Sequence, residues 1–326
     1  MKHNVFTAGV EKLINPITVG TLHFLQSYNE MLPVSTQNKI IEKSSKQNPY
    51  MGFVVEPYCT FLFQKIIDLD YFKQQLPSNF ELVKTTAFAG EEPDYYVIIS
   101  LFNARTSAFM GSRVEAYLIA ENKDTGLMSW IIVDYITNTI SHDPKFGLTK
   151  PSVHEGYVTT DFSGNVVAKM DDYDHTLELE VNIEDGVIKM LDERLWVEGN
   201  LSVSYGTKYD LSGKTFGLKF DPREMSTALD VDVTKLNHYQ NSWFDGYVEN
   251  VPSKIVVFKY AQHFISDSPG SFSDIRTKSE LQEVVDNIDF TDIKPYSTDN
   301  ITKNFTRYPL IFIIVIIVLT ILLVVK

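Results

Sequence analysis

Histidine and aspartate, side chains often found around metals and in acid–base catalysis, gather in two short stretches of the sequence. One is His142-Asp143, and the other contains Asp172, Asp174 and His175. Neither stretch places two histidines four residues apart, as a helical zinc site requires. The aspartate-rich stretch also lacks the glycine and the final glutamate of a calcium-binding loop. We therefore interpret both stretches as solvated loops, and the sequence predicts no metal and no cofactor.

The common catalytic and nucleotide-binding motifs are missing from the sequence. It contains no phosphate-binding loop, no dinucleotide-binding glycine pattern, no nucleophile elbow and no zinc-protease helix. Cys59 is the only cysteine, which excludes an intramolecular disulfide and a zinc site built from several cysteines. With 29 basic and 42 acidic residues the formal net charge is −13, so we expect no nucleic-acid partner.

Most of the chain between Cys59 and Tyr260 has the pattern of β-strands joined by short turns. Apolar and polar residues alternate most strictly in 176–183, and Ser163-Gly164-Asn165 predicts a hairpin turn. Further strands are expected at 61–63, 95–102, 113–120, 129–135, 157–162, 166–170, 195–205 and 254–260, with short helices at 21–32, 68–76 and 279–286. Many strands with few helices favour a mainly β (α+β) fold, either an antiparallel barrel or a sandwich.

The apolar run from Leu310 to Val325 contains no charged residue, no glycine and no proline. A helix that is apolar on every face is typical of a membrane span, so we expect a single-pass C-terminal transmembrane helix at 308–326. No signal peptide is visible at the N-terminus, which predicts a tail-anchored protein with a cytosolic main domain, and the short span suits the endoplasmic reticulum. Three glycosylation sequons, which we interpret as chance occurrences, begin at Asn200, Asn300 and Asn304.

These signals divide the chain into four parts. The sequence predicts a partly helical N-terminal extension at 1–46 and the main β domain at 47–267. A polar stalk rich in serine, threonine, aspartate and asparagine is expected at 268–307, followed by the membrane anchor at 308–326.

The region from Pro49 to Ile183 resembles the acetoacetate decarboxylase family, because four of that family's landmarks occur in its order and near its spacing. The landmarks are a capped helix ending in Leu-Pro (68–77), a glutamate that opens a strand (Glu115 in 112–117), a strand ending in an acidic residue (Asp134 in 131–134), and a glycine-containing segment that ends in a lysine (Lys150 in 146–150). The resemblance covers less than half of the chain.

The resemblance implies a fold, a site and an activity. It implies a closed, conical antiparallel β-barrel of acetoacetate decarboxylase type with peripheral helices and the reactive lysine inside. Lys150 would then form a Schiff base with a carbonyl substrate, and Glu115 would be the acid/base or substrate-orienting group. The implied activity is a lyase of decarboxylase type.

Two positions depart from the family pattern. A lysine amine at its ordinary pKa of about 10.4 is protonated at neutral pH, so burial or a second cation has to activate it. In the decarboxylases a second lysine follows the nucleophile directly, and this chain has Pro151 there. The family's carboxylate-binding arginine corresponds to Tyr58. These departures point away from acetoacetate and toward a larger, less polar carbonyl compound.

Two alternatives do not require catalysis. The first is a non-catalytic β-barrel that binds an apolar or lipid-derived ligand at a membrane surface. The second is a structural or adaptor protein whose barrel interior is filled by side chains. The expected partners are thus a small carbonyl or apolar ligand and a membrane, and the sequence leaves the oligomeric state open.

Overall fold

The computed structural model describes most of the region between Met51 and Ile293 and parts of both ends. The described residues are 2–20, 23, 33–37, 51–106, 109–143, 147–153, 155–267, 270–271, 274–293, 311 and 313–318. Most of the helix expected at 21–32 lies outside these residues, and the four-part division of the chain stays a prediction.

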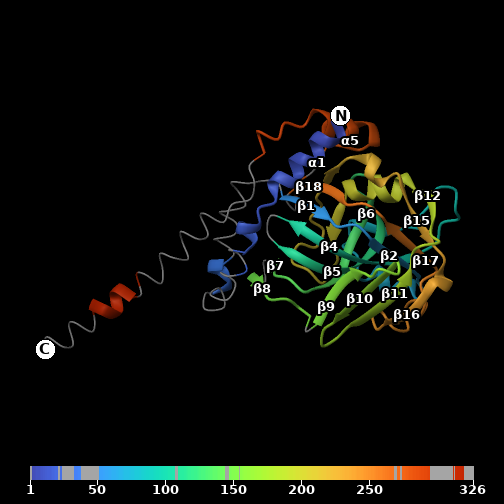
Figure 1. The fold of residues 1–326 in the computed structure, drawn as a ribbon, viewed down its shortest axis with the longest axis horizontal. Helices are drawn as coiled ribbons and strands as arrows, with labels where there is room; N and C mark the ends of the chain where they lie inside the picture. Colours follow the sequence, from blue (N-terminus) through green and yellow to red (C-terminus); the bar gives the residue numbers. More distant parts are fainter. Residues whose placement is uncertain are drawn as a thin grey trace.

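A twelve-stranded mixed sheet forms the centre of the protein (Figure 1). Its strands are β1 (Met51–Val55), β2 (Cys59–Lys65), β3 (Phe80–Leu82), β4 (Tyr96–Thr106), β5 (Met110–Asn122), β6 (Met128–Thr137), β12 (Val187–Met190), β13 (Val203–Tyr205), β14 (Leu218–Phe220), β15 (Thr227–Val231), β17 (Lys254–Phe258) and β18 (Gln262–Ser266). The order is β12-β15-β17-β2-β4-β1-β18-β14. On the other edge of β4 the sheet continues through β5 to β6 and β13.

The sheet is open, so the expected closed conical barrel is wrong. The strand β4 is the branch point, because β2 and β1 pair with successive halves of one of its edges while β5 pairs with the other. Strands β12 and β14 end the main path. Within the described residues, β13 and the chain leading into β14 are joined by two isolated bridges, Val203 with Phe216 and Tyr205 with Ser212, where closure would require a continuous ladder. In the described part of the chain, no continuous ladder joins the edges of the sheet.

A second sheet packs against one face of the large one. It contains β9 (Glu155–Thr160), β10 (Asn165–Asp171), β11 (Thr176–Asn182) and β16 (Leu236–Asn241), in the order β16-β11-β10-β9. The predicted hairpin around Gly164 is confirmed as β9 and β10. The predicted alternation of 176–183 is confirmed too, because Leu177, Leu179 and Val181 are buried against the large sheet. A two-stranded ladder joins β7 (Ser141–Asp143) and β8 (Gly147–Thr149).

The helices lie at the periphery and their ends follow from local capping. Helix α4 (Leu69–Lys73) begins where the Asp68 carboxylate accepts hydrogen bonds from two backbone amides. Helix α5 (Lys278–Asn287) begins with a capping box between Thr277 and Glu280. Helix α1 (Lys2–Leu13) packs on β1 and β18, and Figure 1 shows it beside α5, at the far side of the sheet from β9 and β16.

The segment 195–205, expected as one strand, is mostly helical. It forms a π-helical turn, η1 (Arg194–Glu198), and a 3₁₀ turn, η2 (Gly199–Leu201), before the short strand β13. The Asp192 carboxylate accepts a hydrogen bond from the Leu195 amide at 2.9 Å and thereby caps the turn. This local bond and the burial of Trp196 outweigh the β propensity of the segment. Two more 3₁₀ turns, η3 (Pro222–Met225) and η4 (Val233–Lys235), flank β15.

The structure also shows that the prediction of a transmembrane anchor is wrong. Crossing a bilayer takes a helix of about 20 residues, and no helix within the described residues is both long and apolar enough to do so. Of the expected span 308–326, positions 311 and 313–318 are described, as helix, and the remainder lies outside the described residues. The expected tail-anchored localisation was inferred from this anchor, so it is wrong as well.

Candidate functional site

The inner face of the large sheet lines a cavity of about 460 Å³. Alternate residues of β1, β2, β4, β5, β6 and β18 point into it. The residues between them face the second sheet on β2, β4, β5 and β6, and helix α1 on β1 and β18. On β4, for example, Ser100, Phe102 and Ala104 line the cavity, whereas Ile99 and Leu101 are buried on the opposite face. The period-two geometry of strands therefore separates a cavity side from a packed core.

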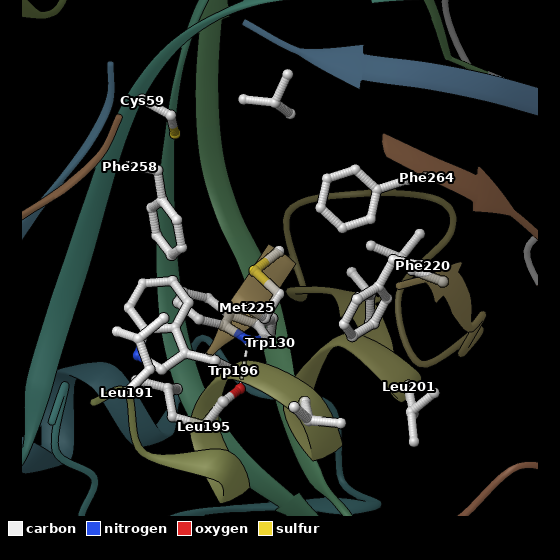
Figure 2. Close-up of a cluster of buried hydrophobic side chains, with 14 of the residues drawn as sticks. Cys59, Trp130, Leu191, Leu195, Trp196, Leu201, Phe220, Met225, Phe258 and Phe264 are labelled. Atoms are coloured by element: carbon white, nitrogen blue, oxygen red, sulfur yellow. Dashed lines mark hydrogen bonds between the residues drawn. The ribbon is translucent and has the colours of Figure 1, made fainter. Parts of the chain in front are cut away.

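Aromatic side chains form one wall of the cavity, shown in part in Figure 2. Trp130 and Trp196 lie 5.4 Å apart between ring centroids, and Phe61 meets Trp196 edge-on at 4.8 Å. The Trp130 indole N–H donates to the Leu195 carbonyl at 3.0 Å, and the Trp196 N–H donates to the Ala87 carbonyl at 2.8 Å. Because both indole donors are bonded to backbone, this wall presents apolar ring surface to the cavity.

Three polar side chains from one strand interrupt the apolar lining. Arg113, Glu115 and Tyr117 are two residues apart along β5, so they share the cavity face. The Arg113 Nη2 atom is 2.9 Å from Glu115 Oε1, and the two side chains are only 12% and 11% exposed. The Tyr117 hydroxyl donates a short hydrogen bond to Glu115 Oε2. Both carboxylate oxygens of Glu115 are therefore held by a neighbour.

Burial and charge shift the acid–base properties around this group. Burial, and then the charge of Glu115, raise the pKa of the Tyr117 hydroxyl well above its ordinary value. Burial followed by the same charge also raises the pKa of the Cys59 thiol. Burial has the largest effect on Arg113 and would lower its pKa, but the Glu115 carboxylate and the neighbouring tyrosines together outweigh burial, so the pKa of Arg113 is raised. Tyr117 and Cys59 therefore stay protonated and Arg113 stays charged at neutral pH.

Aromatic rings also pack against the Arg113 guanidinium. Its central carbon lies 4.6 Å from the Tyr135 ring centroid and 5.1 Å from that of Phe109, distances at which a cation is attracted to the ring. Tyr135 in turn stacks on Tyr209 at 5.6 Å. In the described part of the chain, the buried Nε atom of Arg113 donates to no acceptor.

A β-bulge determines which residues of β6 reach the cavity. Pairing with β5 runs from Ala116–Asp134 to Tyr117–Ile132, so Val133 is skipped. Trp130 and Ile132 line the cavity before the bulge, and Tyr135 lines it after the bulge in the place that strict alternation would give to Asp134.

Asp134 does not line the cavity and belongs to a polar cluster beside it. Its Oδ1 atom accepts hydrogen bonds from Lys208 Nζ at 2.7 Å and from the Tyr209 hydroxyl at 3.3 Å. The His175 ring lies between Asp134 and Asp172, with nitrogen–oxygen distances of 3.6 and 3.5 Å. Within the described residues, no group of three or more His, Cys, Asp or Glu side chains is arranged to hold a metal ion.

The two site residues expected from the sequence are not brought together. Glu115 is buried and lines the cavity. Lys150 follows β8 directly, its side chain is exposed, and it does not line the cavity. Pro151 after it is exposed as well. Tyr58, which the sequence resemblance matched to the family's arginine, has a left-handed backbone (φ 70°) at the turn before β2.

Sequence reasoning missed Arg113, the cation of the cavity. A readable signal was present, because Arg113 stands two residues before Glu115 in a predicted strand and must share its face. The aromatic lining had no such signal, since β1 and β18 come from opposite ends of the chain and pair along their full length.

Comparisons with known proteins add similarities of overall structure. No protein-family model matches the chain, and no curated protein matches it in sequence. Among solved structures, the chain is similar to an acetoacetate decarboxylase from Legionella pneumophila, with 10% identity, a TM-score of 0.38, and coverage of 68% of this chain and 86% of the other. It is also similar to an acetoacetate decarboxylase-like enzyme from Sphingomonas wittichii, with 8% identity, a TM-score of 0.37, and coverage of 68% and 92%.

A further solved acetoacetate decarboxylase is 14% identical, with a TM-score of 0.32 and coverage of 66% of this chain and 85% of the other. These solved structures are therefore from the family whose motifs the sequence resembles. The similarity concerns the fold alone.

Proposed function

We propose that this protein binds an apolar small molecule in the cavity on the inner face of the large sheet. The observation that carries the proposal is an aromatic-walled cavity of about 460 Å³ whose lining contains the buried ion pair Arg113–Glu115. Ligand sites are typically cavities of roughly 300–1,000 Å³, mostly apolar, with a few placed polar groups.

The size of the cavity supports a ligand over incomplete packing. Protein interiors are packed as densely as organic crystals, and voids larger than a water molecule are few. Large side chains such as Trp130 and Trp196 lose dispersion contacts where they face an empty space. A bound apolar molecule restores those contacts, so occupancy should stabilise the fold by the ordinary linkage of binding to folding.

Tryptophan fluorescence offers a direct test. Trp130 and Trp196 line the cavity, whereas Trp243 belongs to the core between the sheets. We expect phenylnaphthylamine, a neutral apolar dye, to bind and to receive excitation energy from the tryptophans. The signal should survive Trp243→Phe and weaken strongly when Trp130 and Trp196 are replaced by phenylalanine.

A variant that fills the cavity separates binding there from binding elsewhere. Ala104 lines the cavity and Ala89 is exposed at the surface. Ala104→Phe should weaken dye binding, and the matched variant Ala89→Phe should not. Native mass spectrometry of the protein as purified should also detect a retained small molecule. Absence of dye binding together with a bare mass would contradict the proposal.

Schiff-base catalysis by Lys150, with Glu115 as acid/base group, remains a second candidate. The observation in its favour is that Glu115 lies in the cavity. The exposure of Lys150 weighs against it, because imine chemistry requires an amine that its surroundings keep unprotonated. Borohydride reduction in the presence of a panel of ketones and aldehydes tests it. Trapping that Lys150→Arg abolishes would support it, and no adduct across the panel would refute it.

A further inference from the structure

We infer that the ligand of this cavity carries a neutral hydrogen-bond acceptor, such as a ketone or ester oxygen, which the Arg113 guanidinium binds in preference to a carboxylate or an amine. This inference rests on the proposed function and specifies the chemical class of the ligand. It follows from the charges, the free donors and the aromatic contacts around Arg113.

The charges lining the cavity are already balanced in pairs. Arg113 is paired with Glu115 at 2.9 Å. Asp267, the other acidic residue of the lining, forms an ion pair with Lys219. A ligand carboxylate would therefore add a second negative charge near Glu115, and a ligand ammonium would add a second positive charge near Arg113. Both would be desolvated without a free partner, which is strongly unfavourable in an apolar site.

At the Arg113–Glu115 pair, the hydrogen-bonding capacity that remains is that of a donor. Glu115 already accepts bonds from Arg113 and Tyr117. A guanidinium carries five N–H donors, and in the described part of the chain the Arg113 Nε finds no acceptor. A buried donor without an acceptor costs free energy, and a ligand oxygen bound to the guanidinium would recover part of that cost.

The surroundings of the guanidinium determine how such an oxygen approaches. The rings of Phe109 and Tyr135 lie within 5.1 and 4.6 Å of its central carbon. Rings at these distances take up space beside the group, so a ligand oxygen has to approach the N–H donors that they leave open. The apolar body of the ligand would then lie along the wall that contains Trp130 and Trp196.

Three ligands of equal chain length test the inference on the wild-type protein. A medium-chain methyl ketone, the corresponding fatty acid and the corresponding primary alkylamine compete with phenylnaphthylamine at a pH at which the acid and the amine are charged. We expect the ketone to displace the dye at a concentration roughly tenfold or more below either charged ligand, the effect of one hydrogen bond to a charged group.

Two variants change the charge without changing the shape. Glu115→Gln leaves the cavity with an unpaired guanidinium, so the fatty acid should gain affinity and become the preferred ligand. The double variant Arg113→Gln with Glu115→Gln removes both charges. It takes the place of the single variant in the test if the single variant does not fold. In the double variant the ketone should lose roughly tenfold in affinity while the dye binds as before. Arg194→Gln, which changes an exposed arginine, is the matched control.

The outcomes separate this inference from the function on which it rests. If the fatty acid displaces the dye as well as the ketone does, or if Glu115→Gln leaves acid binding unchanged, the inference is overturned while dye binding still supports a ligand cavity. If phenylnaphthylamine does not bind at all, the proposed function itself fails.

Discussion

The Arg113 guanidinium and the Glu115 carboxylate meet at 2.9 Å inside an apolar cavity, although only Val114 separates them in the sequence. Their contact comes from strand geometry alone, because residues two apart on β5 point the same way. It does not depend on a distant part of the chain. The pair is thus a local unit that the rest of the fold surrounds and largely buries.

Removing one member of this ion pair should lower the free energy of unfolding more than removing both members. Arg113→Met leaves the Glu115 charge buried without a counter-ion, and we expect it to lower the free energy of unfolding by about 3–5 kcal/mol. Arg113→Met combined with Glu115→Gln should recover a large part of that loss. Urea denaturation of the two single variants and the double variant gives the coupling free energy. Additive losses would contradict a direct interaction.

A glycine beside the cavity wall provides a packing test. A Cβ atom at Gly199 would lie 2.7 Å from the Trp130 ring, whereas at Gly20 it would meet no atom of the described residues within 4 Å. Gly199→Ala should therefore destabilise the protein by about 1–3 kcal/mol and weaken dye binding by displacing Trp130. Gly20→Ala should be neutral or slightly stabilising. Thermal unfolding of both variants measures the difference, and equal stabilities would argue against the tight contact.

Acidification should loosen helix α1. The Glu11 carboxylate on this helix accepts two 2.9 Å hydrogen bonds from Arg105, and these lower the pKa of Glu11 below the ordinary 4.5. The His263 ring also faces Glu11. Glu56 pairs with Arg105, and Glu224 pairs with His263. A lowered folded-state pKa gives stability that is present above pH 4.5 and is lost as the pH falls through the lowered value. Hydrogen exchange of the α1 amides should accelerate in that window.

The matched control for this effect is Glu11→Gln. This variant should exchange faster at neutral pH than the wild type and should lose most of the acid-induced step. An unchanged pH profile in Glu11→Gln would show that another group controls the docking of α1.

Cys59 should react slowly with thiol reagents in the folded protein. Burial and the nearby charge of Glu115 raise the pKa of its thiol, so little thiolate is present at neutral pH. We expect iodoacetamide to label Cys59 far more slowly in buffer than in urea, and saturation with phenylnaphthylamine to slow labelling further. Mass spectrometry follows both rates. Rapid labelling of the folded protein would mean that the cavity admits solvent to this wall.

Local patterns predicted local structure well. The alternation of 176–183, the turn at Gly164 and the Asp68 cap each depend on neighbours in sequence, and each appears in the structure. The segment 195–205 was mispredicted because a capping bond from Asp192 and the burial of Trp196 outweighed its β propensity.

The site was harder to predict because its parts are distant in sequence. Glu115 was identified, but the cavity around it needs β1 paired with β18, some 200 residues away. The closed barrel was mispredicted for a related reason, because whether the last strands meet depends on the curvature of the sheet. In the described part of the chain, isolated bridges and no continuous ladder join β13 to the segment before β14.

Val133, the residue without a partner on β5, determines which of the following residues of β6 face the cavity. With it, Tyr135 faces the cavity, and Asp134 faces Lys208 and His175 instead. Deleting Val133 would exchange Tyr135 and Asp134, so that Asp134 would point into the cavity. The carboxylates of Asp134 and Glu115 would then share the Arg113 guanidinium, and one of them would have to take up a proton to remain buried. A single-residue deletion in a strand would thus convert a charge-balanced binding cavity into one that stores a proton beside its ligand.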